Sequence, residues 1–177
     1  TSLLADLAVH RLDLVIADRP MPANLNVRGY SHWLGESDVS VFGSETLVNT
    51  LPGAFPARLD GAPLLLPGED AAIRPRLEQW LADQRLHPRI VGEFDDSALA
   101  KAFGQAGAGL FVAPTALAAH ICEQHQVSVV GRIEMLSEQL YAITTERRLT
   151  HPAIVAISQA ARDEIFAVPA GTWSGES

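Results

Sequence analysis

The sequence predicts an α/β fold in two lobes, because short apolar runs alternate with helical patterns. Three such runs, each followed by a polar turn, occupy residues 62–67, 89–94 and 109–113. Helical patterns separate them at the spacing of βαβ units, which is typical of a parallel sheet with helices on its faces. Ligands bind such sheets at the carboxyl ends of the strands, so the turns after these runs form the candidate site.

The chain before residue 39 predicts part of a second lobe. An apolar stripe within residues 3–8 indicates a helix without a capping residue before it, so we expect the lobe to be truncated at its N-terminus. Residues 12–17 form a buried run typical of a parallel strand. Residues 20–37, rich in Pro, Gly and Asn, predict a loop with a short strand at 27–33.

Two amphipathic helices are expected in the central region, after a strand at residues 39–43 and an irregular segment at 44–61. The first, with Pro75 in its first turn, is expected to bury Ile73, Leu77, Trp80 and Leu81. The second is expected at residues 97–106 with one buried face, made of Ala98, Leu99, Ala102 and Phe103.

Helix caps follow from the residue types at the turns. Asp95 or Asp96 is expected to cap the helix at residues 97–106, because a carboxylate accepts hydrogen bonds from free N–H groups. Thr115 is expected to cap a third helix, which carries Leu117, Ile121 and Cys122.

The last third of the chain predicts two strands and a helix. The strands are expected at residues 127–131 and 139–145, and the helix has an apolar stripe made of Ile154, Ile157, Ala161 and Ile165. The tail at 169–177 is expected to be disordered.

These elements predict two lobes. Residues 39–131 form a central lobe with hinge strands at its ends. Residues 1–38 and 132–168 form the flanking lobe. Hinged two-lobe proteins of this class bind small ligands in a cleft.

Composition and the absence of certain motifs make several classes of protein unfavourable for this chain. The formal net charge of −8 over 177 residues makes nucleic-acid binding by this chain alone unfavourable. No apolar run reaches the roughly 18 residues of a membrane helix. Cys122 is the single cysteine and fits a reducing cytoplasm. No nucleophile elbow, Walker loop or dinucleotide motif is present, so we do not expect an enzyme or a bound cofactor.

Four blocks carry a family resemblance. Residues 12–18, 63–68, 77–94 and 109–115 together resemble the effector-binding domain of LysR-type transcriptional regulators. The segments 92–97 and 111–115, with His151-Pro-Ala153, are most similar to a sodium-responsive branch that activates an Na⁺/H⁺ antiporter gene. The resemblance implies a fold like that of periplasmic binding proteins. It also implies homodimers or homotetramers, and contact with promoter DNA and RNA polymerase only through a further N-terminal domain.

The same resemblance implies where the effector binds. When the family's effector site is transferred to this sequence, it comprises Pro67, Gly68, Glu69 and Asp70, with Phe94, Asp95 and Asp96 beside them. Many members present hydroxyl groups at the first turn for a carboxylate effector, whereas this chain has acidic residues there. Carboxylates repel an anion and suit a hard cation, so we expect Na⁺ or Li⁺ to bind at Glu69, Asp70, Asp95 and Asp96.

Two alternatives stay open at this point. Acidic residues at helix starts are also explained by capping and the helix dipole alone. A solute-binding protein of a transport system has the same two-lobe architecture, and would bind a small ligand in the cleft between the lobes.

Overall fold

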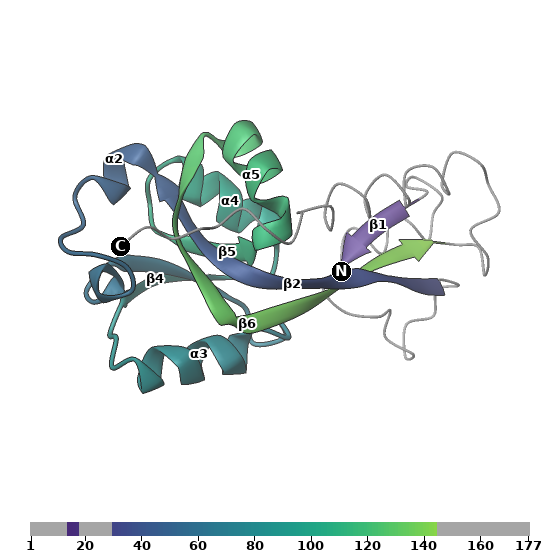
Figure 1. The fold of residues 1–177 in the computed structure, drawn as a ribbon. Helices are drawn as coiled ribbons and strands as arrows, with labels where there is room; N and C mark the ends of the chain where they lie inside the picture. Colours follow the sequence, from purple (N-terminus) through teal and green to yellow (C-terminus); the bar gives the residue numbers. More distant parts are fainter. Residues whose placement is uncertain (1–13, 18–29, 145–177) are drawn as a thin grey trace, which may run out of the picture. The chain divides into compact units, whose positions relative to one another are not determined.

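The computed structural model describes residues 14–17 and 30–144, and the chain divides into two compact units. One unit comprises Thr1–Glu36 and Gln139–Ser177, and the other comprises Ser37–Glu138. Two long strands cross the boundary between them (Figure 1): β2 (Tyr30–Ser44) and β6 (Val127–Thr144). The candidate site lies wholly in the second unit.

The sheet of this second unit contains the three apolar runs. β3 (Pro63–Pro67) and β4 (Arg89–Phe94) pair in parallel, as the βαβ spacing predicts. Leu110 joins β3 on its other side through a parallel bridge, and the chain then enters β5 (Phe111–Pro114). β5 pairs with β2 in antiparallel orientation. The parallel pair of β3 and β4, which carries the candidate turns, is thus a two-stranded sheet joined through the Leu110 bridge to a four-stranded sheet in the order β1-β6-β2-β5.

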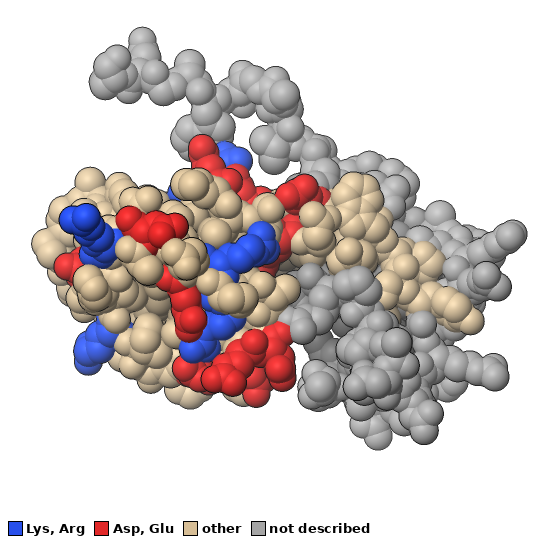
Figure 2. Space-filling view, turned by 90° about the horizontal axis from the view of Figure 1, so that it is seen from below, with Lys and Arg blue, Asp and Glu red and all other residues tan. Residues whose placement is uncertain are grey.

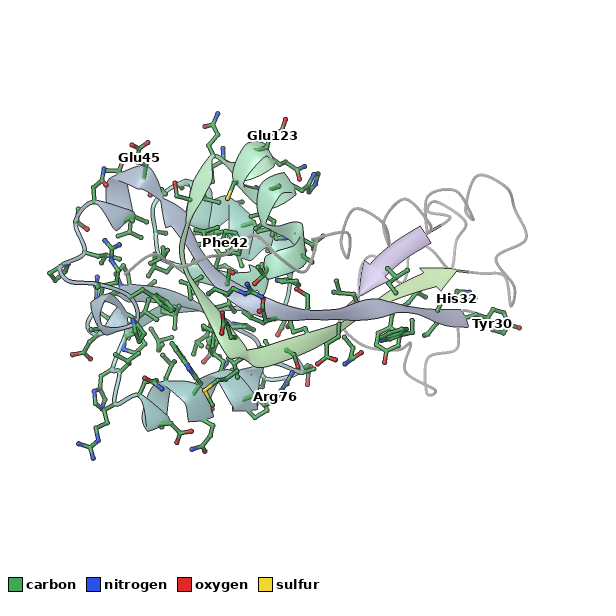
Figure 3. All side chains as sticks on the ribbon, viewed as in Figure 1. Tyr30, His32, Phe42, Glu45, Arg76 and Glu123 are labelled. Carbon is green, nitrogen blue, oxygen red and sulfur yellow. The ribbon has the colours of Figure 1, made fainter. Side chains whose placement is uncertain are left out.

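Helices cover both faces of this sheet (Figure 1). α3 (Arg74–Asp83) covers one face and buries the four residues expected of it, including Leu77 at 1% and Trp80 at 7% exposure. α4 (Ser97–Gln105) and α5 (Ala118–His125) cover the other face, where Ile121 is buried beside Phe42 and Phe111. Those two rings stack at 5.5 Å, and Figure 3 shows Phe42 inside this layer.

Three short helical elements lie between the longer ones. α2 (Glu45–Val48) and the 3₁₀ turn η1 (Ala57–Leu59) lie in the segment that was expected to be irregular. A second 3₁₀ turn, η2 (Thr115–Leu117), precedes α5. In the described part of the chain, no helix has the length and apolarity required to cross a bilayer.

The strand predictions need three corrections. Residues 34–37, expected within a loop, belong to β2, because pairing with β6 satisfies their backbone despite weak local strand preference. Residues 30–33, part of the strand expected at 27–33, lie in β2 as predicted. The two strands expected at 127–131 and 139–145 are one continuous strand, β6. β1 (Leu14–Ala17) pairs with β6 in antiparallel orientation, although its apolar run predicted a parallel strand.

The apolar face expected of α4 to be buried is instead exposed. Leu99 is 51% and Phe103 48% exposed, and Ala98 and Ala102 are exposed as well. Gly104 explains the reversal, since the space of its missing side chain is filled by the Phe111 ring. α4 therefore packs closely on the sheet at its smallest residue, while Leu99 and Phe103 stay about half exposed and the Phe103 ring contacts Phe94.

One of the two capping predictions is confirmed and the other is wrong. Asp96 caps α4, accepting a hydrogen bond from the backbone N–H of Ala98 at 2.8 Å. Thr115 does not cap α5; its hydroxyl bonds that of Ser40 at 2.7 Å. The helices expected at residues 3–8 and 154–165, and the tail at 169–177, lie outside the described residues.

Candidate functional site

The two acidic turns start side by side because the strands before them are paired. Pro67 at the end of β3 is in register with Phe94 at the end of β4. The backbone N–H of Gly68 continues the ladder, donating to the Phe94 carbonyl oxygen at 2.9 Å. After both strands the backbone turns at the same edge of the sheet, which is where the sequence predicted a site.

Gly68 lets the two turns approach closely. A Cβ atom at this position would collide with the Asp95 carboxylate, which lies directly against the Gly68 backbone. Glycine removes that obstacle and places the acidic side chain of one turn over the main chain of the other.

A shallow cavity of about 360 Å³ opens between the turns, lined by Gly68, Glu69, Asp70, Glu93 and Asp95. The four acidic residues are exposed and Gly68 is buried. Four carboxylates share this concavity, and their charges favour a cation over an anion.

One basic residue, Arg74, lies beside these carboxylates, and the sequence interpretation missed it. Its guanidinium donates to Glu93 Oε1 at 3.0 Å, to the Pro67 carbonyl oxygen at 2.7 Å and to Glu78 Oε1 at 2.5 Å. The hydrogen bonds that Arg74 donates, to Glu78 first and then to Glu93, raise the pKa of Arg74 above its already high ordinary value. Only the four-residue spacing to Glu78 was visible in the sequence; the contact with Glu93 depends on strand pairing.

The structure separates the predicted site residues into two groups. Gly68, Glu69, Asp70 and Asp95 line the cavity, whereas Asp96 is outside this lining and caps α4. Pro67 contributes its carbonyl oxygen to Arg74, and Phe94 packs its ring on Phe103 at 5.2 Å between centroids. Among the described residues no three acidic, histidine or cysteine side chains are positioned to share one metal ion. The predicted carboxylates thus lie near one another without forming a ready coordination shell.

Other titratable groups do not form a second site in the described residues. Cys122 is half-buried beside Ile121, and burial raises the pKa of its thiol, which disfavours the reactive thiolate. Burial, with the charges of Lys101 and His120, lowers the pKa of His125. On the face seen in Figure 2 the acidic and basic side chains are interspersed.

Comparison with known proteins gives the family. The family model described as the LysR substrate binding domain matches residues 1–165. The curated transcriptional activator proteins NhaR of Escherichia coli K12 and Shigella flexneri are each 36% identical over 165 residues, 93% of this chain and 54% of theirs. The chain therefore spans about half the length of these relatives.

Solved structures show the same fold. The AmpR effector binding domain from Citrobacter freundii has a TM-score of 0.55 at 21% identity, covering 92% of this chain and 78% of that one. Vibrio fischeri DarR, solved in complex with DNA, has a TM-score of 0.54 at 15% identity, covering 90% and 53%. The expected α/β effector-domain fold is confirmed. The chain belongs to the LysR substrate-binding domain family, the effector-binding domains of LysR-type transcriptional regulators.

Proposed function

We propose that this domain senses Na⁺ or Li⁺ for a cytoplasmic LysR-type activator that controls an Na⁺/H⁺ antiporter gene. The domain acts without catalysis, and the activator contacts promoter DNA and RNA polymerase through the remainder of the full-length protein. The ion binds at the turns after β3 and β4, with oxygen ligands from Glu69, Asp70 and Asp95.

The observation that carries this proposal is the acid-lined cavity at the paired strand ends. Na⁺ and Li⁺ are hard cations, and hard cations take carboxylate and carbonyl oxygens as ligands. An anionic effector would meet repulsion from four carboxylates here. The 36% identity to the NhaR transcriptional activators over most of the chain supports a role in transcriptional activation.

The ion binding we propose draws the turns together. Glu69, Asp70 and Asp95 are exposed, so their side chains are free to rotate toward a shared ion at little cost in packing. Because the turns sit on adjacent strands, a bound ion would couple β3 to β4 and stabilise one arrangement of this edge. A regulator needs such a difference between its free and bound states.

A transcription measurement tests the proposal. We expect the full-length regulator to raise expression from the antiporter promoter when NaCl or LiCl is added, and not when KCl is added at the same ionic strength. Equal expression in the three salts would contradict an ion response and point to an organic effector.

We also propose that the regulator forms homodimers through the exposed face of α4 and β4, and higher assemblies from these dimers. This face carries Leu99 and Phe103 of α4, which are 51% and 48% exposed, and Val91 of β4, which is 42% exposed. Leu99 and Phe103 are four residues apart on α4 and therefore neighbours on one helix face, and adjacent exposed apolar side chains of this size favour an interaction surface. A second copy is the occupant we propose, since most oligomers of soluble proteins are symmetric assemblies of one chain.

A further inference from the structure

β6 shares an apolar core with α3 up to the point where the strand leaves the Ser37–Glu138 unit. Leu136 of β6 is 5% exposed and belongs to the same apolar cluster as Leu77 of α3. Beyond the unit boundary, Leu140 of the same strand is 3% exposed. Every second residue of a strand shares a face, and the buried residue between these two leucines on that face is Glu138. The buried apolar face of β6 is therefore interrupted at the boundary between the units.

A side chain of α3 contacts the backbone of β6 at this interruption. β6 lies between β1 and β2 in the sheet, but among the described residues β1 pairs only with Tyr141–Thr144 of β6. Before Tyr141, carbonyl groups on the edge that β1 leaves free need a donor from a side chain or from water. Arg76 supplies a side-chain donor in this stretch, because its Nη2 atom donates to the carbonyl oxygen of Ser137. Figure 3 shows Arg76 on α3. The guanidinium thus fastens the helix to the strand just before the boundary.

A different contact holds β6 to β2. Nε of Arg132 on β6 donates to Oδ2 of Asp38 on β2 at 2.5 Å, and the Asp38 side chain is only 14% exposed. Arg76, in contrast, is an exposed residue, so its bond to the Ser137 carbonyl forms and breaks next to water. The cross-strand ion pair is therefore the more protected contact, and the bond between α3 and β6 is the easier one to open.

We propose that Arg76 is a latch on β6, which holds the strand to α3 at the unit boundary and sets how readily the strand opens there. When the latch opens, the Ser137 carbonyl oxygen accepts from water instead of from Arg76. The exchange costs little, because one hydrogen bond to an exposed group replaces another. The ion pair between Asp38 and Arg132 stays closed, so β6 and β2 move away from α3 as a pair. The latch does not depend on which effector the domain binds.

Hydrogen exchange of the full-length regulator tests the latch, with the wild type, Arg76→Met and Arg89→Met compared. Methionine keeps an unbranched apolar stem and removes the charge and the donors of arginine. Arg89 at the start of β4 is also exposed, so its substitution controls for the lost charge. We expect Arg76→Met to speed exchange of the backbone amides of residues 137–140 by about fivefold or more, because a hydrogen bond that opposes local opening is lost. Arg89→Met should leave these rates within about twofold of the wild type.

Each of two results would overturn the inference. The first is unchanged exchange of residues 137–140 in Arg76→Met, which would mean that the bond does not restrain the strand. The second is an equal increase throughout α3 and β3 of the same variant, which would make Arg76 a general stabiliser of the unit and no latch. Faster exchange confined to the boundary stretch of β6 supports the inference. Each outcome is independent of the ion response proposed above, since no added ion is needed for the measurement.

Discussion

Replacing Glu69 by Gln and Asp70 by Asn together is expected to weaken activation by Na⁺ and Li⁺ strongly in the intact regulator. Both residues line the cavity and are exposed, so neutral isosteres remove two charges and change little packing. We expect the ion concentration for half-maximal reporter expression to rise by about tenfold or more, since two of the four carboxylates are lost. The measurement is reporter expression across a NaCl series with a KCl series beside it.

A pair of acidic residues elsewhere in the same unit controls for net charge. Glu45 on α2 and Glu123 on α5 point outward, away from the sheet (Figure 3). The double variant Glu45→Gln, Glu123→Gln changes net charge equally and should respond as the wild type does. An unchanged response in the Glu69→Gln, Asp70→Asn variant would exclude these turns as the sensor.

Leu99→Glu is expected to dissociate the dimer we propose. Leu99 lies on the outward face of α4 and is 51% exposed, so a charge there is tolerated in the monomer. In a dimer the charge would be desolvated at the interface, and we expect the dissociation constant to rise by roughly 30-fold or more, about 2 kcal/mol or more. Sedimentation equilibrium of the variant and the wild type measures this directly.

Met135→Glu is the matched control for that substitution. Met135 on β6 is 80% exposed and lies outside the α4 and β4 face, so the same gain of charge should leave association unchanged. Identical sedimentation of all three proteins, or a wild type that stays monomeric at high concentration, would show that the α4 face is not an interface.

The parallel core of the fold could be predicted from local pattern. The runs that became β3 and β4, and the stripe that put Leu77 and Trp80 in the core, are periodicities that tertiary contacts reinforce. The position of the candidate site followed from them, because adjacent parallel strands end at one edge. Four of the predicted residues accordingly line one cavity.

What the sequence did not predict depends on contacts between distant residues. The long strands β2 and β6 are far apart in the sequence, so no local pattern could predict that they pair. The orientation of α4 follows from the fit of Gly104 against Phe111, so the helix buries its small side although its stripe suggests the opposite. Arg74 reaches Glu93 only because β3 and β4 are neighbours.

Thermal melting of this chain in NaCl, LiCl and KCl at matched ionic strength tests the central claim most directly. A ligand that binds only the folded state raises the melting temperature by mass action, and matched ionic strength cancels general salt effects. The acid-lined turns predict a higher melting temperature in NaCl or LiCl than in KCl, and no such difference in the Glu69→Gln, Asp70→Asn variant. Identical melting curves for the wild type in all three salts would contradict ion sensing by this domain.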